Sequence, residues 1–447
     1  MSVTIKWDIT YKCNLNCNHC INGKYLNKDY DEIDLETIKK IVSEIDDVAG
    51  IEYIHFLGGE PTTRKDFIDI CKYLDNSNIR FGFNSNGIKL NHDYVKELSK
   101  LKYLDRIVLS LESPIKEEND AIRGRNVYNC INNAIDTINE NISRRIIAVN
   151  MVVSKKNYKS IDQMIDFCLK RNVKELSFLQ LIEEGNAKDS HLSLNYDEIV
   201  ESAIVIGSRS MEDYKKIKLF PKFLRPLTID YVNKKYDKSC PSITHGCGAG
   251  TNFIYLDNEG KLYPCDRVKF KNISDNTISL REKEFSVGWE DDMMAIPFRI
   301  MESDEYRNLK VCSDCKYFMN TCFPCSLDNF KSTNNQCIET NKRINEFLYG
   351  NIEMNYGPFR IYNDGTKSVI HNVANAETIE VDQKAKFVFD KIRMARNIGL
   401  CDLDKIADEI DLDLDEIIDF INYLSECGFL SKPKVDTIKC LKNIEDF

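Results

Sequence analysis

The first half of the chain alternates short runs of β-branched or apolar residues with longer segments whose apolar residues recur every three or four positions. This alternation is typical of repeated strand and helix units around a parallel sheet. The predicted strands cover residues 4–9, 51–57, 79–84, 106–111, 146–153 and 175–181. The predicted helices cover residues 35–48, 67–74, 94–100, 127–140 and 161–171. The pattern predicts an α/β fold, either a partial (β/α)6 TIM-like barrel or an open doubly wound sheet, and in both the functional residues collect at the carboxyl ends of the strands.

The rest of the chain changes character twice. Between about residues 206 and 345 the spacing is irregular and most of the cysteines occur, as expected where metal rather than a large core organises the fold. One hairpin is predicted there, with strands at residues 253–256 and 261–263. Short strands at residues 359–362, 368–371 and 378–381 then precede helices at residues 383–396, 403–409 and 413–427, an order that suggests a small winged-helix-like α+β module. The predicted domains are residues 1–205, 206–350 and 351–447.

Composition narrows the class of protein. The 447 residues exceed what one ordinary core holds, and 43% hydrophobic with 30% charged residues is globular composition. A formal net charge of -10 disfavours general binding to a phosphate backbone. The sequence starts without a signal-like segment and has no apolar run of membrane-spanning length. We therefore expect a cytoplasmic protein that binds neither nucleic acid nor membrane.

Seventeen cysteines in such a chain argue for metal ligation or redox chemistry more than for disulfides. Some are scattered in helix-like or tail segments and are interpreted as small buried hydrophobes: Cys71, Cys130, Cys168, Cys401, Cys427 and Cys440. The other eleven form an N-terminal trio and a cluster between Cys240 and Cys337. Both groups require a chemical explanation.

The N-terminal trio is Cys13, Cys17 and Cys20, in a CNLNCNHC stretch directly after the first predicted strand. Three thiolates can bind three irons of a cubane and leave the fourth open, whereas a structural zinc site or an electron-transfer cubane usually has four protein ligands. Stray thiols or part of a zinc site are the alternatives. The CxxxCxxC spacing in this context resembles the signature of the radical S-adenosylmethionine (SAM) superfamily. The resemblance implies a [4Fe-4S] cluster with an open iron that binds SAM.

Further residues resemble that family at the expected places. Gly58, Gly59 and Glu60 follow the second predicted strand, where relatives contact the amino group of SAM. The turn at residues 84–87 and the loop at residues 119–124 are similar to family segments, and His19 is interpreted as shielding the cluster. The cofactor-binding residues that the resemblance implies are Gly58, Gly59, Glu60, Ser110, Glu112, Arg123 and Asn150. For Arg123 a surface ion pair, and for Asn150 a barrel-capping role, are the alternatives.

The chemistry that the resemblance implies belongs to the cofactor. SAM accepts one electron, supplied by a donor such as flavodoxin or ferredoxin, and breaks to methionine and a 5'-deoxyadenosyl radical that abstracts a substrate hydrogen. The protein supplies orientation and a dry pocket. No catalytic residue is therefore nominated beyond the cluster and SAM, and no general base.

The second cysteine cluster resembles the seven-cysteine pattern of SPASM domains. Cys247 and Cys265 open the pattern, and the remainder nearly follows, with Cys322 one position later than usual. The resemblance implies two auxiliary iron-sulfur clusters of the [4Fe-4S] type. One would be held by Cys240, Cys247, Cys265 and Cys325, and the other by Cys312, Cys315, Cys322 and Cys337. Two four-cysteine zinc sites are the alternative, and without Cys240 the first auxiliary cluster would keep an open iron.

SPASM-containing radical SAM enzymes commonly modify ribosomally synthesised peptides, and many carry a winged-helix element that binds the leader of the precursor. The leading hypothesis is therefore a radical SAM maturase that forms an intramolecular thioether crosslink in a precursor peptide. A leader would add as a strand near residues 359–371, and the acidic helices of that module disfavour DNA. Carbon-carbon crosslinking and sulfatase-maturase-like oxidation of Cys or Ser are the enzymatic alternatives. A non-catalytic zinc-binding adaptor is the alternative from another class.

Overall fold

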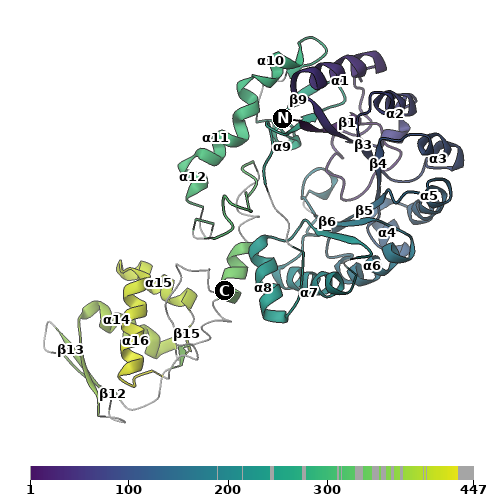
Figure 1. Ribbon diagram of the computed structural model, residues 1–447. Helices are drawn as coiled ribbons and strands as arrows, with labels where there is room; N and C mark the ends of the chain where they lie inside the picture. Colours follow the sequence, from purple (N-terminus) through teal and green to yellow (C-terminus); the bar gives the residue numbers. More distant parts are fainter. Residues whose placement is uncertain are drawn as a thin grey trace. The chain divides into compact units, whose positions relative to one another are not determined.

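The structure is a computed structural model with two compact units. It describes residues 2–188, 190–213, 215–241, 246–273, 278–309, 312–313, 315–327, 336–344, 352–353, 359–363, 367–372, 376–395, 397–398 and 400–430. The first unit comprises Met1–Ser313 with Tyr317–Gln336, and the second comprises Asp314–Lys316 with Cys337–Phe447 (Figure 1). Within the described residues, no helix is long and apolar enough to cross a membrane.

One ten-stranded sheet organises the first unit, in the order β10-β9-β8-β1-β2-β3-β4-β5-β6-β7. Neighbouring strands from β8 through β7 run parallel, whereas β9 runs antiparallel to both β8 and β10. The strands are β1 (Val3–Thr10), β2 (Ile51–Gly58), β3 (Phe81–Ser85), β4 (Leu104–Ser110), β5 (Ile147–Val153), β6 (Glu175–Gln180), β7 (Lys218–Pro221), β8 (Phe253–Leu256), β9 (Lys261–Tyr263) and β10 (Ile278–Ser279).

The order of β1 to β6 in space follows their order in sequence. A doubly wound sheet reverses its strand order at a switch point, so this sheet is singly wound. The predicted α/β fold with a partial barrel is therefore confirmed, and the doubly wound alternative is wrong. Among the described residues no ladder joins the two edge strands, β10 and β7.

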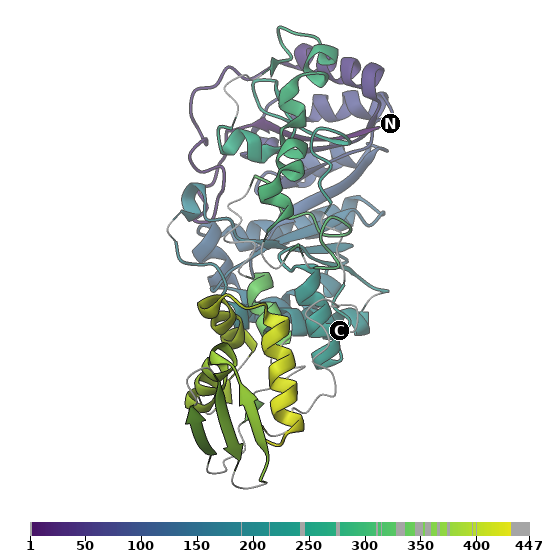
Figure 2. The same ribbon diagram turned by 90° about the vertical axis from the view of Figure 1, so that its left-hand side faces the viewer.

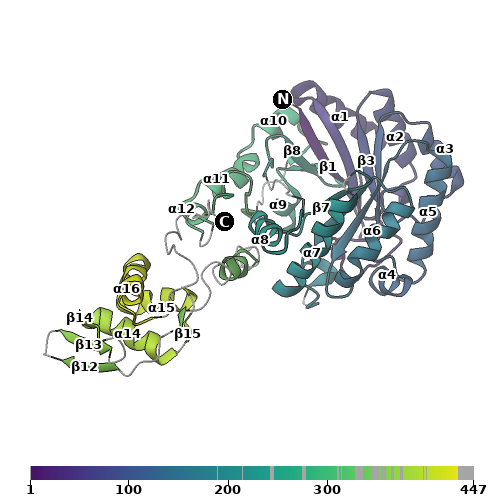
Figure 3. The same ribbon diagram turned by 60° about the horizontal axis from the view of Figure 1, so that its bottom comes forward.

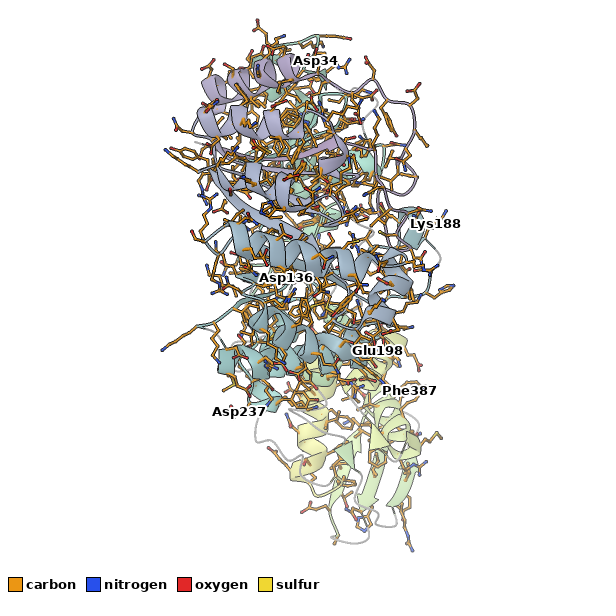
Figure 4. The ribbon with its side chains drawn as sticks, turned by 90° about the vertical axis from the view of Figure 1, so that its right-hand side faces the viewer. Asp34, Asp136, Lys188, Glu198, Asp237 and Phe387 are labelled. Atoms are coloured by element: carbon orange, nitrogen blue, oxygen red, sulfur yellow. The ribbon has the colours of Figure 1, made fainter. Side chains whose placement is uncertain are left out.

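Helices pack along the outer side of the curved sheet (Figure 3). They are α1 (Leu35–Ala49), α2 (Phe67–Asn76), α3 (His92–Ser99), α4 (Lys116–Arg123), α5 (Val127–Asn141), α6 (Ile161–Lys170), α7 (Tyr196–Asp213) and α8 (Pro226–Tyr236). In α1 the buried residues Ile38, Ile41, Val42 and Ile45 recur at helical spacing, which gives one apolar face. Asp34 (Figure 4) caps α1, since its side chain accepts from the backbone N–H of Thr37 at 2.8 Å.

The segment after β7 returns to the same sheet. The predicted hairpin forms as β8 and β9, but β8 also pairs in parallel with β1. Short helices α9 (Asp266–Phe270), α10 (Phe285–Trp289), α11 (Ile296–Glu302) and α12 (Asp304–Arg307) follow, shown in green in Figure 2. The sheet thus continues past residue 205, the predicted domain boundary. Ile254, Tyr255 and Leu256 are fully buried, so this strand is part of the core of the first unit.

The second unit has the predicted order of short strands followed by helices. A three-stranded antiparallel sheet holds β12 (Phe359–Asn363), β13 (Ser368–Asn372) and β14 (Thr378–Val381). Helices α14 (Gln383–Ala395), α15 (Leu400–Ile410) and α16 (Leu414–Glu426) pack against it through a buried cluster that includes Ile370, Ile379, Phe389, Leu424 and Phe429. The strands β11 (Ile352–Glu353) and β15 (Asn397–Ile398) form a separate short pair.

The cysteines interpreted as structural are only partly tested. Cys71 and Cys168 are fully buried, as predicted, whereas Cys130 and Cys427 are half-buried. The side chain of Cys401 and all of Cys440 lie outside the described residues.

Two glycines let the end of β2 approach the end of β1. Gly58 has φ +120°, and a Cβ added there would lie 2.1 Å from the carbonyl oxygen of Thr10. A Cβ on Gly59 would lie 2.3 Å from the carbonyl oxygen of Lys12. The backbone N–H of Gly59 donates to Thr10 O at 2.6 Å, so the two strand ends are held together where the cysteine-bearing loop begins.

We expect Gly58→Ala to lower the free energy of unfolding by about 3 kcal/mol, because it adds a left-handed strain and a backbone clash together. Urea unfolding followed by circular dichroism measures the change. Gly246→Ala is the matched control, since a Cβ there has nothing within 4 Å. Equal unfolding midpoints for the two variants would contradict the close-approach argument.

Candidate functional site

A cavity of about 350 Å³ lies at the carboxyl ends of the central strands. It gathers side chains from β1 to β6 and from the loops that follow them, as expected for a parallel sheet of this type. The predicted site residues that line it are Cys13, Cys17, Cys20, Gly58, Gly59, Glu60, Ser110, Glu112, Arg123 and Asn150. The structure therefore brings the N-terminal trio and every predicted cofactor-binding residue to one place.

The three N-terminal thiols face an environment that disfavours their charged form. Burial, with smaller contributions from nearby acidic groups, raises the pKa of Cys13 to about 11 and that of Cys20 to about 11. Burial also raises the pKa of Cys17, although the Arg123 guanidinium lowers it. Among the described residues no three His, Cys, Asp or Glu side chains converge on a single ion. A cubane takes each thiolate on a different iron and supplies the missing positive charge, so this donor set fits an iron-sulfur cluster.

The loop that carries the trio is held from two sides. On one side Asn18 donates from its backbone N–H to Ile122 O at 2.9 Å, and its side chain donates to Ala121 O at 3.0 Å. These carbonyls belong to α4, a helix that the sequence pattern did not predict. The predicted family-like loop at residues 119–124 therefore contributes carbonyl oxygens that hold the cysteine loop by hydrogen bonds.

On the other side the loop meets residues that sequence reasoning missed. The backbone N–H of Asn186 donates to Cys20 O at 2.9 Å, and its side chain donates to Cys17 O at 2.9 Å. Gly185 has φ +60°, and a Cβ there would lie 2.4 Å from Cys20 O. The Gly-Asn pair after the predicted strand at residues 175–181 was the available signal, since it marks a tight turn.

The Glu60 carboxylate binds the neighbouring strand end. It is buried, and its Oε1 accepts from the Thr62 hydroxyl at 2.7 Å and from the Ser85 hydroxyl at 2.9 Å. Its Oε2 accepts from the backbone N–H of Asn86 at 2.7 Å. Burial raises the pKa of Glu60 although these hydrogen bonds lower it. The predicted turn at residues 84–87 thus positions Glu60, and one further donor can still bond to Oε2.

Glu112 lies at the centre of a buried ionic group. Its Oε1 is 2.6 Å from Arg123 Nη1 and 3.1 Å from His19 Nε2, and its Oε2 accepts from the backbone N–H of Val152 at 2.7 Å. Burial alone would raise the pKa of Glu112, but His19 and Arg123 hold it at about 2. His19 lines the cavity beside the trio, and its buried Nδ1 has no hydrogen-bond partner among the described residues.

Ser110 and Asn150 are adjacent at the ends of β4 and β5, paired in the strand register. Both side chains line the cavity, and among the described residues neither side chain has a hydrogen-bond partner. A hydroxyl and an amide placed side by side can bond the hydroxyls of a bound ligand.

A further part of the cavity wall comes from β1 and α9. Lys6 and Asp8 project from β1, and the Lys6 ammonium pairs with Asp266 at the start of α9. Burial raises the pKa of Asp8, although Tyr255 and Lys6 lower it. This charged wall was not predicted, because residues 6 and 8 only alternate with apolar positions on a strand.

The second cysteine group is partly assembled in the first unit. Cys312 is buried in a cluster with Met301, Tyr306 and Leu309. Burial raises the pKa of Tyr306, and the thiols that raise it further are Cys247, Cys322, Cys312 and Cys325. These four cysteines are therefore electrostatic neighbours of one tyrosine.

The remaining members of this group differ in their surroundings. Burial raises the pKa of Cys265 to about 12, and Cys325 contributes to the rise. Burial raises the pKa of Cys240 to about 12, with its backbone N–H bonded to Asn233 Oδ1 at 2.7 Å. Cys315 and Cys337 belong to the second compact unit.

Known proteins resemble this chain over the region that forms the cavity. Residues 7–168 match the family model of the radical SAM superfamily. Mycofactocin maturase MftC of Mycolicibacterium smegmatis is 25% identical over 320 residues, which are 71% of this chain and 76% of the relative. AdoMet-dependent heme synthase of Methanosarcina barkeri is 24% identical over 340 residues, which are 74% of this chain and 92% of the relative.

A solved structure shares the fold. Streptococcus suis SuiB bound to precursor peptide SuiA matches with a TM-score of 0.53 and 18% identity, over 67% of this chain and 67% of that chain. At this identity the likeness concerns the arrangement of helices and strands.

We expect Glu112→Gln to lower the free energy of unfolding at neutral pH by about 3 kcal/mol, because it leaves the buried Arg123 guanidinium without its counter-charge. The folded-state pKa of about 2 lies below the ordinary value of 4.5, so the stabilisation is complete above that value and is lost as the pH falls through about 2. Urea titrations at neutral pH and at about pH 3.5 should show the gap between wild type and variant narrowing in acid. Glu117→Gln, an exposed change on α4, the helix that carries Arg123, is the control; a gap that is independent of pH would contradict the ionic assignment.

Proposed function

Because the chain belongs to the radical SAM superfamily, we propose that it is a radical SAM maturase whose cluster is bound by Cys13, Cys17 and Cys20 and whose substrate is a ribosomally synthesised peptide. One observation carries the proposal. The cysteine trio and the residues that relatives use for SAM line a single cavity of about 350 Å³. Cys13, Cys17 and Cys20 would hold a [4Fe-4S] cluster, which when bound would supply the electron for reductive cleavage of SAM and so the radical chemistry at the substrate.

The cavity residues bind and orient SAM in this proposal. Glu60 accepts from the ammonium group through the free position on Oε2, and Gly58 and Gly59 keep the backbone close to the loop. Ser110 and Asn150 bond the ribose hydroxyls, since their side chains are adjacent and line the cavity. These contacts hold the cleaving bond near the substrate and exclude water.

We assign Glu112 and Arg123 a positioning role rather than direct contact with the ribose. Both Glu112 oxygens already accept from protein donors, and Arg123 Nη1 is committed to Glu112. Arg123 O lies 3.6 Å from Cys17 Sγ, and His19 links the loop to Glu112. The ionic group therefore fixes the cysteine loop against the strand ends. A flavodoxin or ferredoxin supplies the electron in this proposal.

Two auxiliary [4Fe-4S] clusters are part of the proposal. The convergence of Cys247, Cys312, Cys322 and Cys325 around Tyr306, with Cys265 beside Cys325, supports iron-sulfur ligation in this segment. Cys240 as the fourth ligand of the first auxiliary cluster, and Cys315 and Cys337 as ligands of the second, rest on the resemblance to SPASM domains. These clusters would accept the electron that an oxidised substrate gives up.

A peptide is the proposed substrate for three reasons. MftC is a maturase, and the solved SuiB structure holds a precursor peptide. The heme synthase uses 92% of its length to match 74% of this chain, so this chain has length beyond it. The second unit ends its described sheet with β12 and β14, and an extended leader can pair with such an edge. Within this class the proposed product is a thioether between Cys and a carbon, with a carbon-carbon crosslink or oxidation of Cys or Ser as the alternatives.

After anaerobic reconstitution we expect about twelve irons per chain and 5'-deoxyadenosine on reduction with SAM. The triple variant Cys13→Ala, Cys17→Ala and Cys20→Ala should lose about four irons and all SAM cleavage, because the open cubane has no ligands. Iron and labile sulfide assays with chromatography of 5'-deoxyadenosine measure both. Cys168→Ala, the same change at a cysteine buried in α6, is the matched control and should retain both. Bound zinc without SAM cleavage would leave the zinc-binding adaptor in place of the enzyme.

The gene neighbourhood is first searched for a short reading frame rich in Cys, and co-expression of that peptide with this chain should give a product that has lost two hydrogens in mass. If the link is a thioether, the linked cysteine resists iodoacetamide, because its sulfur is no longer a thiol. Tandem mass spectrometry locates the link, and the same peptide without its N-terminal leader should be modified poorly. A crosslinked product whose cysteines all alkylate would contradict the thioether and favour the carbon-carbon link.

A further inference from the structure

The proposed oxidation releases a proton for which no acceptor has been named. In forming a thioether, the C–H hydrogen leaves with the 5'-deoxyadenosyl group, the S–H bond breaks, and the new C–S bond forms. One electron passes to an iron-sulfur cluster acting as oxidant, and one proton remains. A carbon-carbon crosslink releases a proton in the same way. A basic group at the cavity is therefore required for the reaction to proceed in a dry site.

Three of the four carboxylates that line the cavity are committed elsewhere. Glu60 holds four short or moderate hydrogen bonds from Thr62, Ser85 and Asn86. Glu112 is paired with Arg123 and His19, which makes it a weak base. Asp266 is paired with the Lys6 ammonium.

Asp8 is the fourth carboxylate, and its oxygens can accept further hydrogen bonds. It is 2% exposed and projects from β1, two residues after Lys6 on the same face. Its Oδ2 accepts from Tyr255 Oη at 2.6 Å and has a long contact of 3.5 Å from Asn22 Nδ2. A carboxylate has about four acceptor positions, so most of this group remains available. No ion pair within 4.0 Å holds Asp8 among the described residues.

A directed chain of hydrogen bonds positions Asp8. Lys269 Nζ donates to Tyr11 Oη at 2.6 Å and to Asp257 Oδ2 at 2.9 Å. Tyr11 Oη and Tyr255 Oη are 3.0 Å apart, and because the Tyr255 hydrogen is used on Asp8, Tyr11 is the donor to Tyr255. The hydrogen bonds from Lys269 to Tyr11, from Tyr11 to Tyr255 and from Tyr255 to Asp8 therefore run in one direction, and the Tyr255 hydroxyl faces one oxygen of Asp8.

The charged and titratable groups around Asp8 come from several elements. Lys6 lies on the same strand, Lys269 on α9, Tyr255 on β8, and Tyr11 follows β1. Burial raises the pKa of Asp8, and these four groups lower it. The balance leaves a carboxyl group that is more basic than Glu112 or Asp266, in agreement with the geometry.

We propose that Asp8 accepts the proton released by the substrate during the oxidation and that Tyr255 is the positioning residue that aims it. This inference rests on the proposed function, since it requires a peptide substrate to be oxidised in this cavity. It adds a catalytic group where the sequence motifs supplied none.

The test compares crosslinked peptide formed per 5'-deoxyadenosine, with the precursor peptide that the co-expression experiment identifies as the probe. Asp8→Asn keeps an acceptor for Tyr255 but cannot take up a proton, so the ratio is expected to fall about 100-fold while 5'-deoxyadenosine still forms. Tyr255→Phe should lower the ratio about tenfold, and Asp8→Glu, which keeps the carboxylate, should recover part of the loss. Cluster absorbance and circular dichroism confirm that each variant is folded and loaded.

The matched control is Asp266→Asn, the same chemical change on another cavity carboxylate. It breaks an ion pair and should lower the amounts of crosslinked peptide and of 5'-deoxyadenosine together. The ratio of crosslinked peptide to 5'-deoxyadenosine should therefore stay within about threefold of wild type. A wild-type ratio in Asp8→Asn overturns the inference and leaves the proposed function intact, and so does a collapse confined to Asp266→Asn. SAM cleavage by the wild type without any change in the peptide overturns both.

Discussion

The register of β1 is the constraint on which the site depends. This strand lies between β2 and β8 and runs parallel to both, so its backbone is fixed from two sides. Alternation along the strand buries Ile5, Trp7 and Ile9 on one face and turns Lys6 and Asp8 to the cavity. A slip of one residue would exchange the two sets, and the Trp7 indole N–H, which donates to Asp257 O at 3.1 Å, opposes such a slip. The end of the same strand delivers the chain into the cysteine loop.

The protein itself holds the cysteine loop in place, but the buried surroundings of its thiols disfavour the charged thiolate form. Backbone and side-chain hydrogen bonds from Asn18 and Asn186 fix its course. Burial nevertheless raises the pKa of Cys13 and Cys20 to about 11. A cation that binds three thiolates removes this penalty, so cluster binding adds to the stability of the loop. The fold thus supplies the geometry and the metal supplies the charge.

The sequence predicts the strands, helices and motifs whose signals lie within a short stretch of residues. The six strands, the helices α1, α2, α3, α5 and α6, and the hairpin at β8 and β9 follow from periodicity and turn residues, and the cysteine trio follows from spacing. The parallel pairing of β8 with β1 was beyond it, because the partners are about 250 residues apart and the hairpin alone explains the local pattern. The short strand β7 carries Pro221 and only four residues, which is too little signal for periodicity.

The site residues that escaped prediction act through partners rather than through motifs. In the sequence Asn186 is an ordinary loop asparagine, and only the fold brings it to Cys17. Asp8 is an ordinary polar position on a strand, and only the fold brings Tyr255 of β8 to it. Glu112 lines the cavity, but the sequence could not show that His19 and Arg123 would occupy its Oε1. Pairing across the fold decides what such a residue does.

The carboxylates of the cavity show how partners divide one residue type into different roles. Asp8, Glu60 and Glu112 are at most 2% exposed and Asp266 is half-buried, and burial acts on the pKa of each of them in the same direction. Glu112 and Asp266 each form an ion pair with a basic side chain, and these pairs hold the surrounding segments in place. Glu60 accepts hydrogen bonds from neutral donors, which hold its carboxylate in one orientation. Asp8 accepts from the Tyr255 hydroxyl and keeps acceptor positions free at the cavity, which is the basis for assigning the proton transfer to it.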